Sequence, residues 1–335
     1  MPRRSPLVIG HRGAPGYRPE HSRSSYDLAL EMGVDAVEPD VVFTADGVAV
    51  VRHENEISTT TDVAARPEFA DRRTTKTIDG RDLTGWFTED FTWNELATLR
   101  CRERLPQLRP RSASFDDTQP ILRFSDLLEL VRRAGLDQGR EIGVVLEIKH
   151  ATYFGGIGYD VASLLAAELA AARWDAGQLP LIVESFEQTA LTQLRDRGIR
   201  ARYVYLLEAA GRPFDLAARH GATSPTYAAQ LTPAGLDRLA AEVDGISLDK
   251  KIVLAEKGGR VAGTSPVVAA AQERGLEVYT WTCRPENAFL ARPFRRGRDK
   301  AAFGDWEAEW TAIADAALDG VFVDHPDLGV DFFRR

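Results

Sequence analysis

The stretch VEPDVVFTADGVAVVRH (Val37–His53) decides how many barrel strands the fold can contain. It consists of two apolar, β-rich runs separated only by TADG, which is too short for a crossover between parallel strands. An Asp-Gly pair between two such runs is instead typical of a β-hairpin. We therefore expect the two runs to pair antiparallel, which places His53 near Glu38 and Asp40.

On both sides of this stretch, β-rich apolar runs alternate with amphipathic stretches such as SDLLELVRRAG. This alternation is typical of a parallel α/β fold. The runs exceed by one the eight strands of a barrel, and the hairpin accounts for the surplus. We predict a TIM-type (β/α)8 barrel whose strands come from Leu7–Gly10, Ala36–Phe43, Val48–His53, Ile142–Ile148, Leu181–Ser185, Tyr203–Leu207, Gly245–Leu248, Val278–Thr282 and Val321–Val323.

Residues 54–119 break this alternation and are rich in Thr, Arg and Asp. Within them, Thr92 and Glu95 have the spacing of a helix capping box. We interpret residues 1–335 as a single catalytic domain, with 54–119 as an inserted subdomain over the face that carries His53. Elsewhere, Gly33 and Gly135 occupy positions expected for helix C-caps.

Composition excludes several classes of protein. A net charge of −8 argues against a nucleic-acid-binding protein. Two cysteines are too few for a disulfide framework. Because no long apolar run is present, we expect no signal peptide or transmembrane helix. The cytoplasm is the default location, or the periplasm or exterior if a leader has been removed, and the sequence offers no basis for choosing an oligomeric state.

Polar residues gather where the apolar runs end. In a barrel these carboxyl ends meet on one face, where active sites lie. A single charge at such a position is more often part of a structural ion pair, but a whole set at equivalent strand ends indicates a site. The set comprises His11, Arg12, Glu38, Asp40, His53, Glu147, Lys149, Glu184, Ser185, Trp281 and Asp324.

Three carboxylates in this set suit a metal ion. Side chains alternate along a strand, so Glu38 and Asp40 share one face, and Glu147 can join them from another strand. Hard oxygen ligands favour Mg²⁺ or Ca²⁺ over zinc. The alternative is a charge cluster in which the carboxylates pair with Arg12 and Lys149. Lys149 is also placed to balance a phosphate that bridges the metal.

The two histidines offer proton transfer. Cleavage of a phosphodiester needs one group that takes a proton from the nucleophile and one that protonates the leaving alkoxide. His11 and His53 can divide this work, because histidine titrates near neutral pH. The alternative is that each histidine only caps a strand end with hydrogen bonds.

An ordered set of motifs carries a family resemblance. HRG, PEH, VEPDVVFTADGVAVVRHE, LEIK, SF, YTWT and DGVFVDHPD occur in this order between Leu7 and Asp327. Together they resemble the glycerophosphodiester phosphodiesterases. TDVAARPEF, GWFTEDFTWNEL and EIKHATYF further resemble the subgroup with a long insertion after the second histidine.

The resemblance implies a barrel of the phospholipase-C-like phosphodiesterase type, which hydrolyses glycerophosphodiesters to glycerol 3-phosphate and an alcohol with one divalent metal ion, Ca²⁺ or Mg²⁺. It assigns acid/base catalysis to His11 and His53, and metal binding to Glu38, Asp40 and Glu147. Arg12 and Lys149 would hold the phosphate, and Trp281 would pack against the glycerol. The expected partner is thus a small-molecule glycerophosphodiester.

Two positions depart from the family pattern. His21 stands where the family usually has Asn, which puts the usual role of the neighbouring Glu20 in question. Glu54 stands where the family usually has Asp, so its contact with histidine or metal is expected to shift.

Two other functions fit the same motifs. One is a phospholipase D-like hydrolase of lysophospholipids, which would need an exposed apolar loop, with Gly85–Phe87 and Thr152–Gly156 as candidates. The other is a non-catalytic glycerophosphodiester-binding protein, for which the loss of a histidine or metal ligand would be expected.

Overall fold

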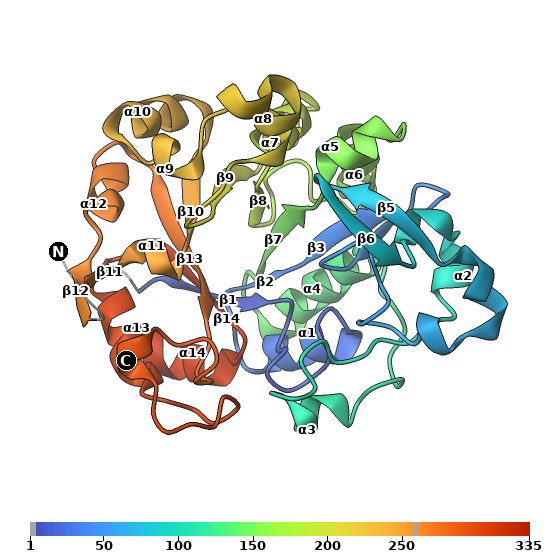
Figure 1. Cartoon of the computed structure of the whole chain (residues 1–335), viewed down its shortest axis with the longest axis horizontal. Coiled ribbons are helices and arrows are strands. Elements are labelled where there is room, and N and C mark those ends of the chain that lie inside the picture. Colours follow the sequence, from blue (N-terminus) through green and yellow to red (C-terminus); the bar gives the residue numbers. More distant parts are fainter. Residues whose placement is uncertain (1–4, 258–259) are drawn as a thin grey trace.

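Parallel strands close into a barrel in the computed structural model, which describes residues 5–257 and 260–335 (Figure 1). Pairing between the second and third barrel strands completes the ring. This arrangement confirms the predicted TIM-type barrel. In chain order the eight strands are β1 (Leu7–His11), β2 (Ala36–Glu38), β7 (Gly143–Ile148), β8 (Leu181–Ser185), β9 (Arg202–Leu207), β10 (Gly245–Asp249), β13 (Glu277–Cys283) and β14 (Gly320–Val323).

The surplus strand is the expected hairpin. After β2 the chain continues as β3 (Asp40–Phe43), turns, and returns antiparallel as β4 (Ala49–Val51). β3 still pairs parallel with β7, so Asp40 lies beside Glu147 at the end of the barrel. The hairpin therefore carries His53 back toward the strand ends, as predicted.

Strand alternation determines which side chains point into the barrel. A separate small core cluster takes one residue from each of seven barrel strands: Ile9, Ala36, Val145, Ile182, Val204, Tyr279 and Phe322. Because side chains two positions apart share a face, the residues two positions further along point to the same side. Those residues are His11, Glu38, Glu147, Glu184, Leu206, Trp281 and Asp324. The polar side chains at the strand ends therefore point inward and lie together above this layer, at the carboxyl end of the barrel.

Helices surround the barrel (Figure 1). The longer ones are α1 (Arg23–Glu31), α4 (Phe124–Gln138), α6 (Val161–Ala171), α7 (Gln188–Asp196), α10 (Pro233–Glu242), α13 (Trp306–Ala314) and α14 (Pro326–Phe333). Shorter helices are α5 (Ala151–Gly156), α8 (Phe214–His220), α9 (Tyr227–Gln230), α11 (Lys250–Val253) and α12 (Pro266–Gln272), with 3-10 turns η4 (Gly221–Thr223) and η5 (Arg292–Phe294). The apolar faces of these helices pack on the outward-facing strand residues in the main core.

One predicted helix end is wrong. α4 continues through Gly135 and ends at Gly139, which adopts the left-handed conformation (φ +63°). Gly135 has another role, since a Cβ there would lie 3.0 Å from the carbonyl oxygen of Arg140. That contact is tighter than most Cβ contacts, so a side chain at this position would displace the neighbouring backbone by a few tenths of an ångström.

The segment 54–119 forms small elements, most of them on the right of Figure 1 and the last of them at the bottom. They are η1 (Val63–Ala65), η2 (Pro67–Arg72), the hairpin β5 (Thr74–Ile78) and β6 (Arg81–Gly85), η3 (Thr88–Asp90), α2 (Trp93–Leu96) and α3 (Pro110–Ala113). The expected capping box of α2 is present. Apolar residues of this segment belong to the same core cluster as the barrel helices. Its description as a subdomain of one catalytic domain stays a prediction.

A second hairpin, β11 (Leu254–Lys257) and β12 (Arg260–Thr264), follows α11. Among residues 5–257 and 260–335, no helix has the length and apolar character needed to cross a membrane. The first four residues, on which the expectation of no leader partly rests, lie outside the described residues.

Candidate active site

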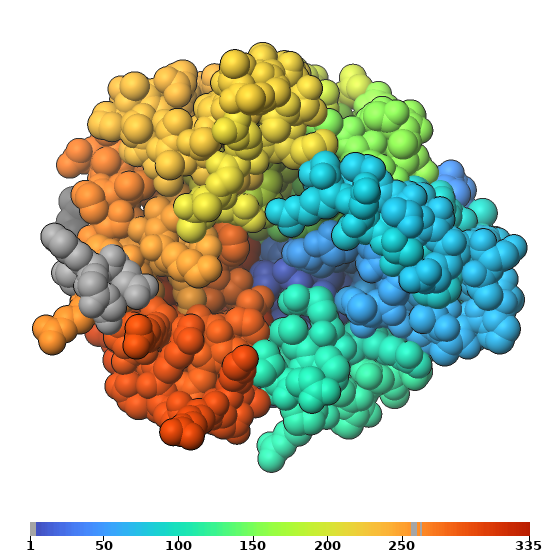
Figure 2. Space-filling model, in the orientation of Figure 1, coloured from blue at the N-terminus to red at the C-terminus, as the bar shows by residue number. Residues whose placement is uncertain are grey.

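A cavity of about 790 Å³ opens at the carboxyl ends of the barrel strands. Figure 2 shows a hollow in the middle of this face, with the inserted segment along one side. Most of the predicted site residues line the cavity: His11, Arg12, His53, Glu54, Glu147, Lys149 and Trp281. The others are Glu20, Glu38 and Asp40. They do not line the cavity, but each of them contacts Arg12, which does.

Strand register brings the carboxylates together. Glu147 lies beside Asp40 on one side and beside Glu184 on the other. Glu38, Glu147 and Glu184 each place an oxygen within 4.8 Å of the other two, and all three are buried. Glu184 was noted in the sequence as a polar strand end but was not assigned to the metal set.

Asp40 faces positive groups as well as this cluster. It accepts a hydrogen bond from His21 Nε2 at 2.8 Å, and Arg12 Nε lies 3.4 Å away. Lys149 Nζ lies 3.7 Å from its other oxygen. Burial alone would raise the pKa of Asp40, but His53, Lys149 and Arg12 hold it well below its usual range. Asp40 is therefore the ionised member of the carboxylate set.

The remaining carboxylates are crowded without enough positive charge. Burial and then the neighbouring carboxylate Asp40 raise the pKa of Glu38 well above its usual range, and burial with Glu147 does the same for Glu184. Burial raises the pKa of Glu147 to about 8, even though Lys149 opposes it.

The donor atoms of this set fit a hard cation. Among the described residues, one buried oxygen each of Glu38, Asp40 and Glu184 has no hydrogen-bond partner. Unused carboxylate oxygens that face a shared, negatively charged point are what Mg²⁺ or Ca²⁺ binds in proteins. The residues present therefore fit a divalent metal ion.

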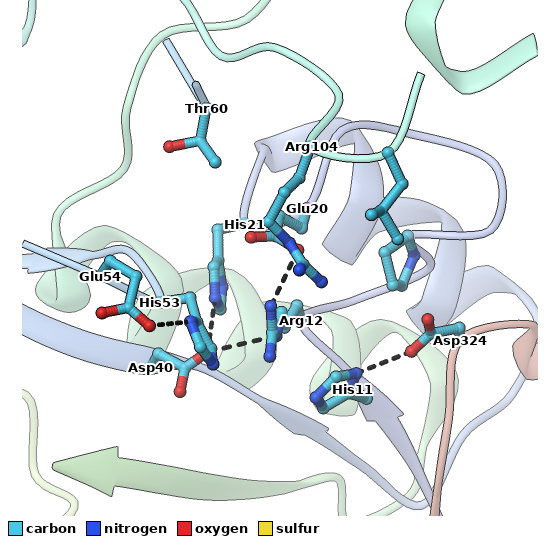
Figure 3. A network of polar contacts seen from close by, with 12 residues as sticks. His11, Arg12, Glu20, His21, Asp40, His53, Glu54, Thr60, Arg104 and Asp324 are labelled. Carbon is cyan, nitrogen blue, oxygen red and sulfur yellow. Dashed lines mark hydrogen bonds and ion pairs between the residues drawn. The ribbon is translucent and has the colours of Figure 1, made fainter. Parts of the chain in front are cut away.

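His11 is held by a buried aspartate at the end of β14. Its Nδ1 lies 2.7 Å from Asp324 Oδ1, as Figure 3 shows. Arg284 and Arg109 both donate to the other oxygen of Asp324 at 2.6 Å. Burial would raise the pKa of Asp324, but these arginines keep it well below its usual range. An ionised carboxylate only accepts, so His11 donates from Nδ1 and leaves Nε2 as a proton acceptor.

His53 repeats this arrangement across the site. Its Nδ1 lies 2.8 Å from Glu54 Oε1, and its Nε2 lies 3.4 Å from Lys149 Nζ. Burial and then the positive charge of Arg12 lower the pKa of His53 to about 4, and the same two causes lower that of His11 to about 3. Both imidazoles are therefore neutral at pH 7 and able to accept a proton.

Arg12 and Lys149 bring fixed positive charge into the cavity. Arg12 adopts a left-handed backbone conformation (φ +60°), and its Nη1 donates to Glu20 Oε2 at 2.9 Å. Lys149 Nζ donates to Glu147 Oε1 at 2.9 Å. Trp281 lies against Phe186, with the rings 5.6 Å apart and nearly perpendicular, and so forms an apolar wall beside these charges.

The two departures from the family pattern both make defined contacts. His21 is fully buried, and its Nδ1 lies 2.7 Å from the Tyr26 hydroxyl while its Nε2 contacts Asp40. Glu20 keeps a place beside Arg12 and also accepts from Arg104 Nε at 2.9 Å. The longer Glu54 side chain contacts His53 Nδ1, and the expected shift of this contact stays a prediction.

Several polar residues of the site were missed or left unassigned in the sequence. Asp324 had a strand-end signal, but its partner His11 lies 313 positions away in the sequence, on the neighbouring strand β1. Arg109, Arg284 and His150 lie in loops or at helix starts, where no periodic pattern marks them. Only the contacts of the folded chain identify these three.

Comparison with known proteins gives one consistent family. The sequence profile of the "Glycerophosphoryl diester phosphodiesterase family" matches residues 11–328. Glycerophosphodiester phosphodiesterase GDPD6 of Arabidopsis thaliana is 29% identical over 303 residues, covering 87% of this chain and 78% of that protein. A glycerophosphodiester phosphodiesterase of Treponema pallidum is 26% identical over 349 residues, covering 98% and 92%.

Solved structures show the same fold. A phosphodiesterase of Oleispira antarctica, solved with the product sn-glycerol-3-phosphate, aligns with a TM-score of 0.64 at 19% identity and covers 99% of this chain and 98% of its own. A glycerophosphodiester phosphodiesterase of Agrobacterium tumefaciens aligns with a TM-score of 0.57 at 18% identity, covering 97% and 99%. The resemblance drawn from the motifs is thus confirmed along nearly the whole chain.

Proposed function

The chain belongs to the glycerophosphoryl diester phosphodiesterase family, and we propose that this enzyme hydrolyses glycerophosphodiesters to glycerol 3-phosphate and an alcohol, using one divalent metal ion and two histidines. The proposal rests on the groups that line, or lie directly beside, one cavity. It combines two histidines, each backed by a carboxylate, with buried carboxylates that have free oxygens and with Arg12 and Lys149.

Glu38, Asp40 and Glu147 would hold the metal ion, which is Ca²⁺ or Mg²⁺. Glu184 places an oxygen within 4.8 Å of oxygens of Glu38 and Glu147, whereas Asp40 lies beside Glu147 on the adjoining strand, so Glu184 would add a further oxygen ligand to this set. When bound, the ion supplies positive charge that stabilises the negative charge developing on the phosphoryl oxygens. Arg12 and Lys149 add fixed charge for the phosphate, and the flat wall at Trp281 suits the apolar face of glycerol.

His11 and His53 would divide the two proton transfers. Each has its Nδ1 engaged by a carboxylate, Nε2 of His53 also lies 3.4 Å from Lys149 Nζ, and each imidazole is neutral before substrate binds. One histidine accepts the proton of the nucleophile, while the other takes a proton from solvent once the anionic phosphodiester lies beside it and gives that proton to the leaving alkoxide. Asp324 and Glu54 stabilise the imidazolium that forms at each side.

Chelation tests the metal. EDTA should abolish release of glycerol 3-phosphate from glycerophosphocholine, and Mg²⁺ or Ca²⁺ should restore it, in an assay coupled to glycerol 3-phosphate oxidation. Glu147→Gln should raise the metal concentration needed for half activity, because a neutral amide replaces a charged ligand. Asp82→Asn, which changes an exposed carboxylate away from the cluster, is the matched control and should behave like the parent. Full activity in chelator would contradict the metal site.

Burial counts against the phospholipase D-like alternative. Trp86 and Phe87 of the first candidate loop and Phe154 of the second are buried in the core, and Tyr153 of the second loop is half-buried. These loops therefore present little of their aromatic surface to an acyl chain. A non-catalytic binding protein would give no product in the coupled assay with either metal.

A further inference from the structure

Both carboxylates that back the histidines depend on the inserted segment. Glu54 begins this segment, and Asp324 receives a hydrogen bond from Arg109 within it. The hairpin β5–β6 of the same segment reaches the cavity with Asp79 at its turn. The segment is therefore in contact with the histidine on each side of the site, in addition to lining the pocket.

On the His53 side the link runs through His150. Glu54 has a side chain that is 42% exposed, so it needs a partner to hold one orientation. His150 Nε2 lies 3.0 Å from Glu54 Oε2, and His150 Nδ1 lies 2.6 Å from Asp79 Oδ2. Asp79 fixes His150, His150 fixes Glu54, and Glu54 fixes the tautomer of His53.

The charge state of His150 supports this chain of contacts. Burial alone would lower its pKa, but the hydrogen bonds with Asp79 and Glu54 outweigh burial and raise the pKa to about 9. His150 is therefore positive at neutral pH and donates from both ring nitrogens. Two carboxylates bridged by an imidazolium form charge-assisted hydrogen bonds, which are stronger than neutral ones.

The backbone at His150 also points to a constraint. His150 has φ +51°, in the left-handed region that non-glycine residues rarely adopt. Asp79 is left-handed too (φ +47°), but it forms a two-residue Asp-Gly turn with Gly80, where this conformation is usual. No such turn explains His150, so the strain is held by its surroundings, as is common at functional sites.

On the His11 side the link is direct. The guanidinium of Arg109 is buried and donates to three acceptors: Asp324 Oδ2 at 2.6 Å, Glu286 Oε1 at 2.8 Å and the Pro15 carbonyl at 3.1 Å. It thereby joins the insertion to the loop after β13 and to the loop after β1. Asp324 is fixed by this fork and passes its orientation to His11.

We propose that Asp79 and Arg109 are positioning residues through which the inserted segment orients both histidines, Asp79 acting on His53 and Arg109 acting on His11. The inference rests on the proposed function, because it assigns these residues to the two-histidine reaction. The competing explanation is that both ion pairs only anchor the segment to the barrel. Anchoring would affect the fold equally whichever histidine is present, whereas positioning requires the histidine concerned.

Double-mutant cycles separate these explanations. Asp79→Asn should lower kcat for glycerophosphocholine roughly 10-fold, as second-layer partners of reactive groups do, with little change in KM. In a His53→Ala background the same change should cost nothing further, whereas in a His11→Ala background it should still lower kcat. Asp82→Asn, on the same hairpin, is the control for loss of a surface charge and should leave kcat unchanged.

A second double-mutant cycle tests Arg109 against His11 in the same way. Arg109→Lys keeps a buried positive charge beside Asp324 but loses the fork, and it should lower kcat in the parent and in His53→Ala but not in His11→Ala. Arg102→Gln, in the same segment, removes a half-buried arginine that is paired with the exposed Asp117 and serves as the control. Thermal unfolding of each variant verifies that it is folded, and the Asp79 arm decides the proposal if Arg109→Lys does not fold.

Equal losses in every background, or parent kcat in Asp79→Asn, would overturn the proposal and leave the segment as a structural anchor. Failure of the proposed function gives a different result. In that case His11→Ala or His53→Ala by itself would retain parent activity before any second change is made.

Discussion

The two histidine sites use the same pairing in unlike surroundings. His11 and Asp324 both end barrel strands, are nearly inaccessible, and are fixed by the permanently charged Arg109 and Arg284. His53 follows the β3–β4 hairpin, its side chain is 25% exposed, and its partner Glu54 is held by a titratable group, His150. The barrel supplies one site ready-made, whereas the other is assembled from a hairpin, a loop and the inserted segment.

This difference in burial and in partners predicts which histidine site is rigid and which one responds to pH and to changes in the insertion. Loss of a buried partner leaves other buried charges uncompensated, so the His11 side is expected to resist every condition except direct mutation. The half-exposed Glu54 can be rehydrated when its partners are lost, so the His53 side is expected to respond to pH and to changes in the insertion. Measurements of activity, of stability and of pH dependence test whether the two sites differ in this way.

The largest effect should come from the histidines themselves. His11→Ala and His53→Ala should each lower kcat roughly 10²–10⁴-fold, the usual contribution of one general acid or base. The double mutant should lose less than the product of the two losses, because groups that act as a unit are not additive. Steady-state kinetics on glycerophosphocholine provides the measurement.

A nitrophenyl phosphodiester then assigns the roles. Its leaving group needs little protonation, so it should rescue the variant that lacks the acid and not the variant that lacks the base. If either single variant keeps near-parent activity on the natural substrate, that histidine only caps its strand.

The next largest effect should distinguish the two carboxylates by stability. Asp324→Asn leaves Arg109 and Arg284 buried beside a neutral amide and should lower the free energy of unfolding by about 3 kcal/mol or more. Glu54→Gln, at a half-exposed position, should lower it by no more than about 1 kcal/mol. Urea unfolding followed by tryptophan fluorescence measures both. Equal losses would show that the two sites do not differ in the way their burial suggests.

The smallest effect should be a pH dependence confined to the His53 side. The folded-state pKa of His150, about 9, lies above the unfolded value of 6.5, so folding favours the protonated form. The stabilisation is complete below pH 6.5 and is lost as the pH rises through about 9, which amounts to about 2 kcal/mol between pH 7 and 9.

His150→Gln is the comparison for this measurement, because glutamine cannot titrate. The difference in unfolding free energy between the parent and this variant should shrink as the pH rises from 7 to 9. A difference that stays constant would mean that His150 is not protonated in the folded protein. Arg109 and Arg284 keep their charge throughout this range, so the His11 side contributes no such change.

The strand pattern was predictable because it is local. An Asp-Gly turn between two β-rich runs identified the β3–β4 hairpin, and the remaining runs then matched the eight barrel strands. The two-residue alternation also placed Glu38 and Asp40 on one face. The helix end predicted at Gly135 was misplaced because Gly135 lies inside α4, close to the backbone of Arg140, and Gly139 is the residue that takes the left-handed capping conformation.

The sequence by itself determined the barrel, its hairpin and the polar strand ends, since each follows from alternation along a few consecutive residues. Only the tertiary structure decided which partners these residues meet. Asp324 reaches His11 across 313 positions of chain, Arg109 reaches Asp324 across 215, and Asp79 reaches His150 across 71. Loops have no period that fixes the direction of a side chain, and contacts across such separations depend on how the whole ring closes.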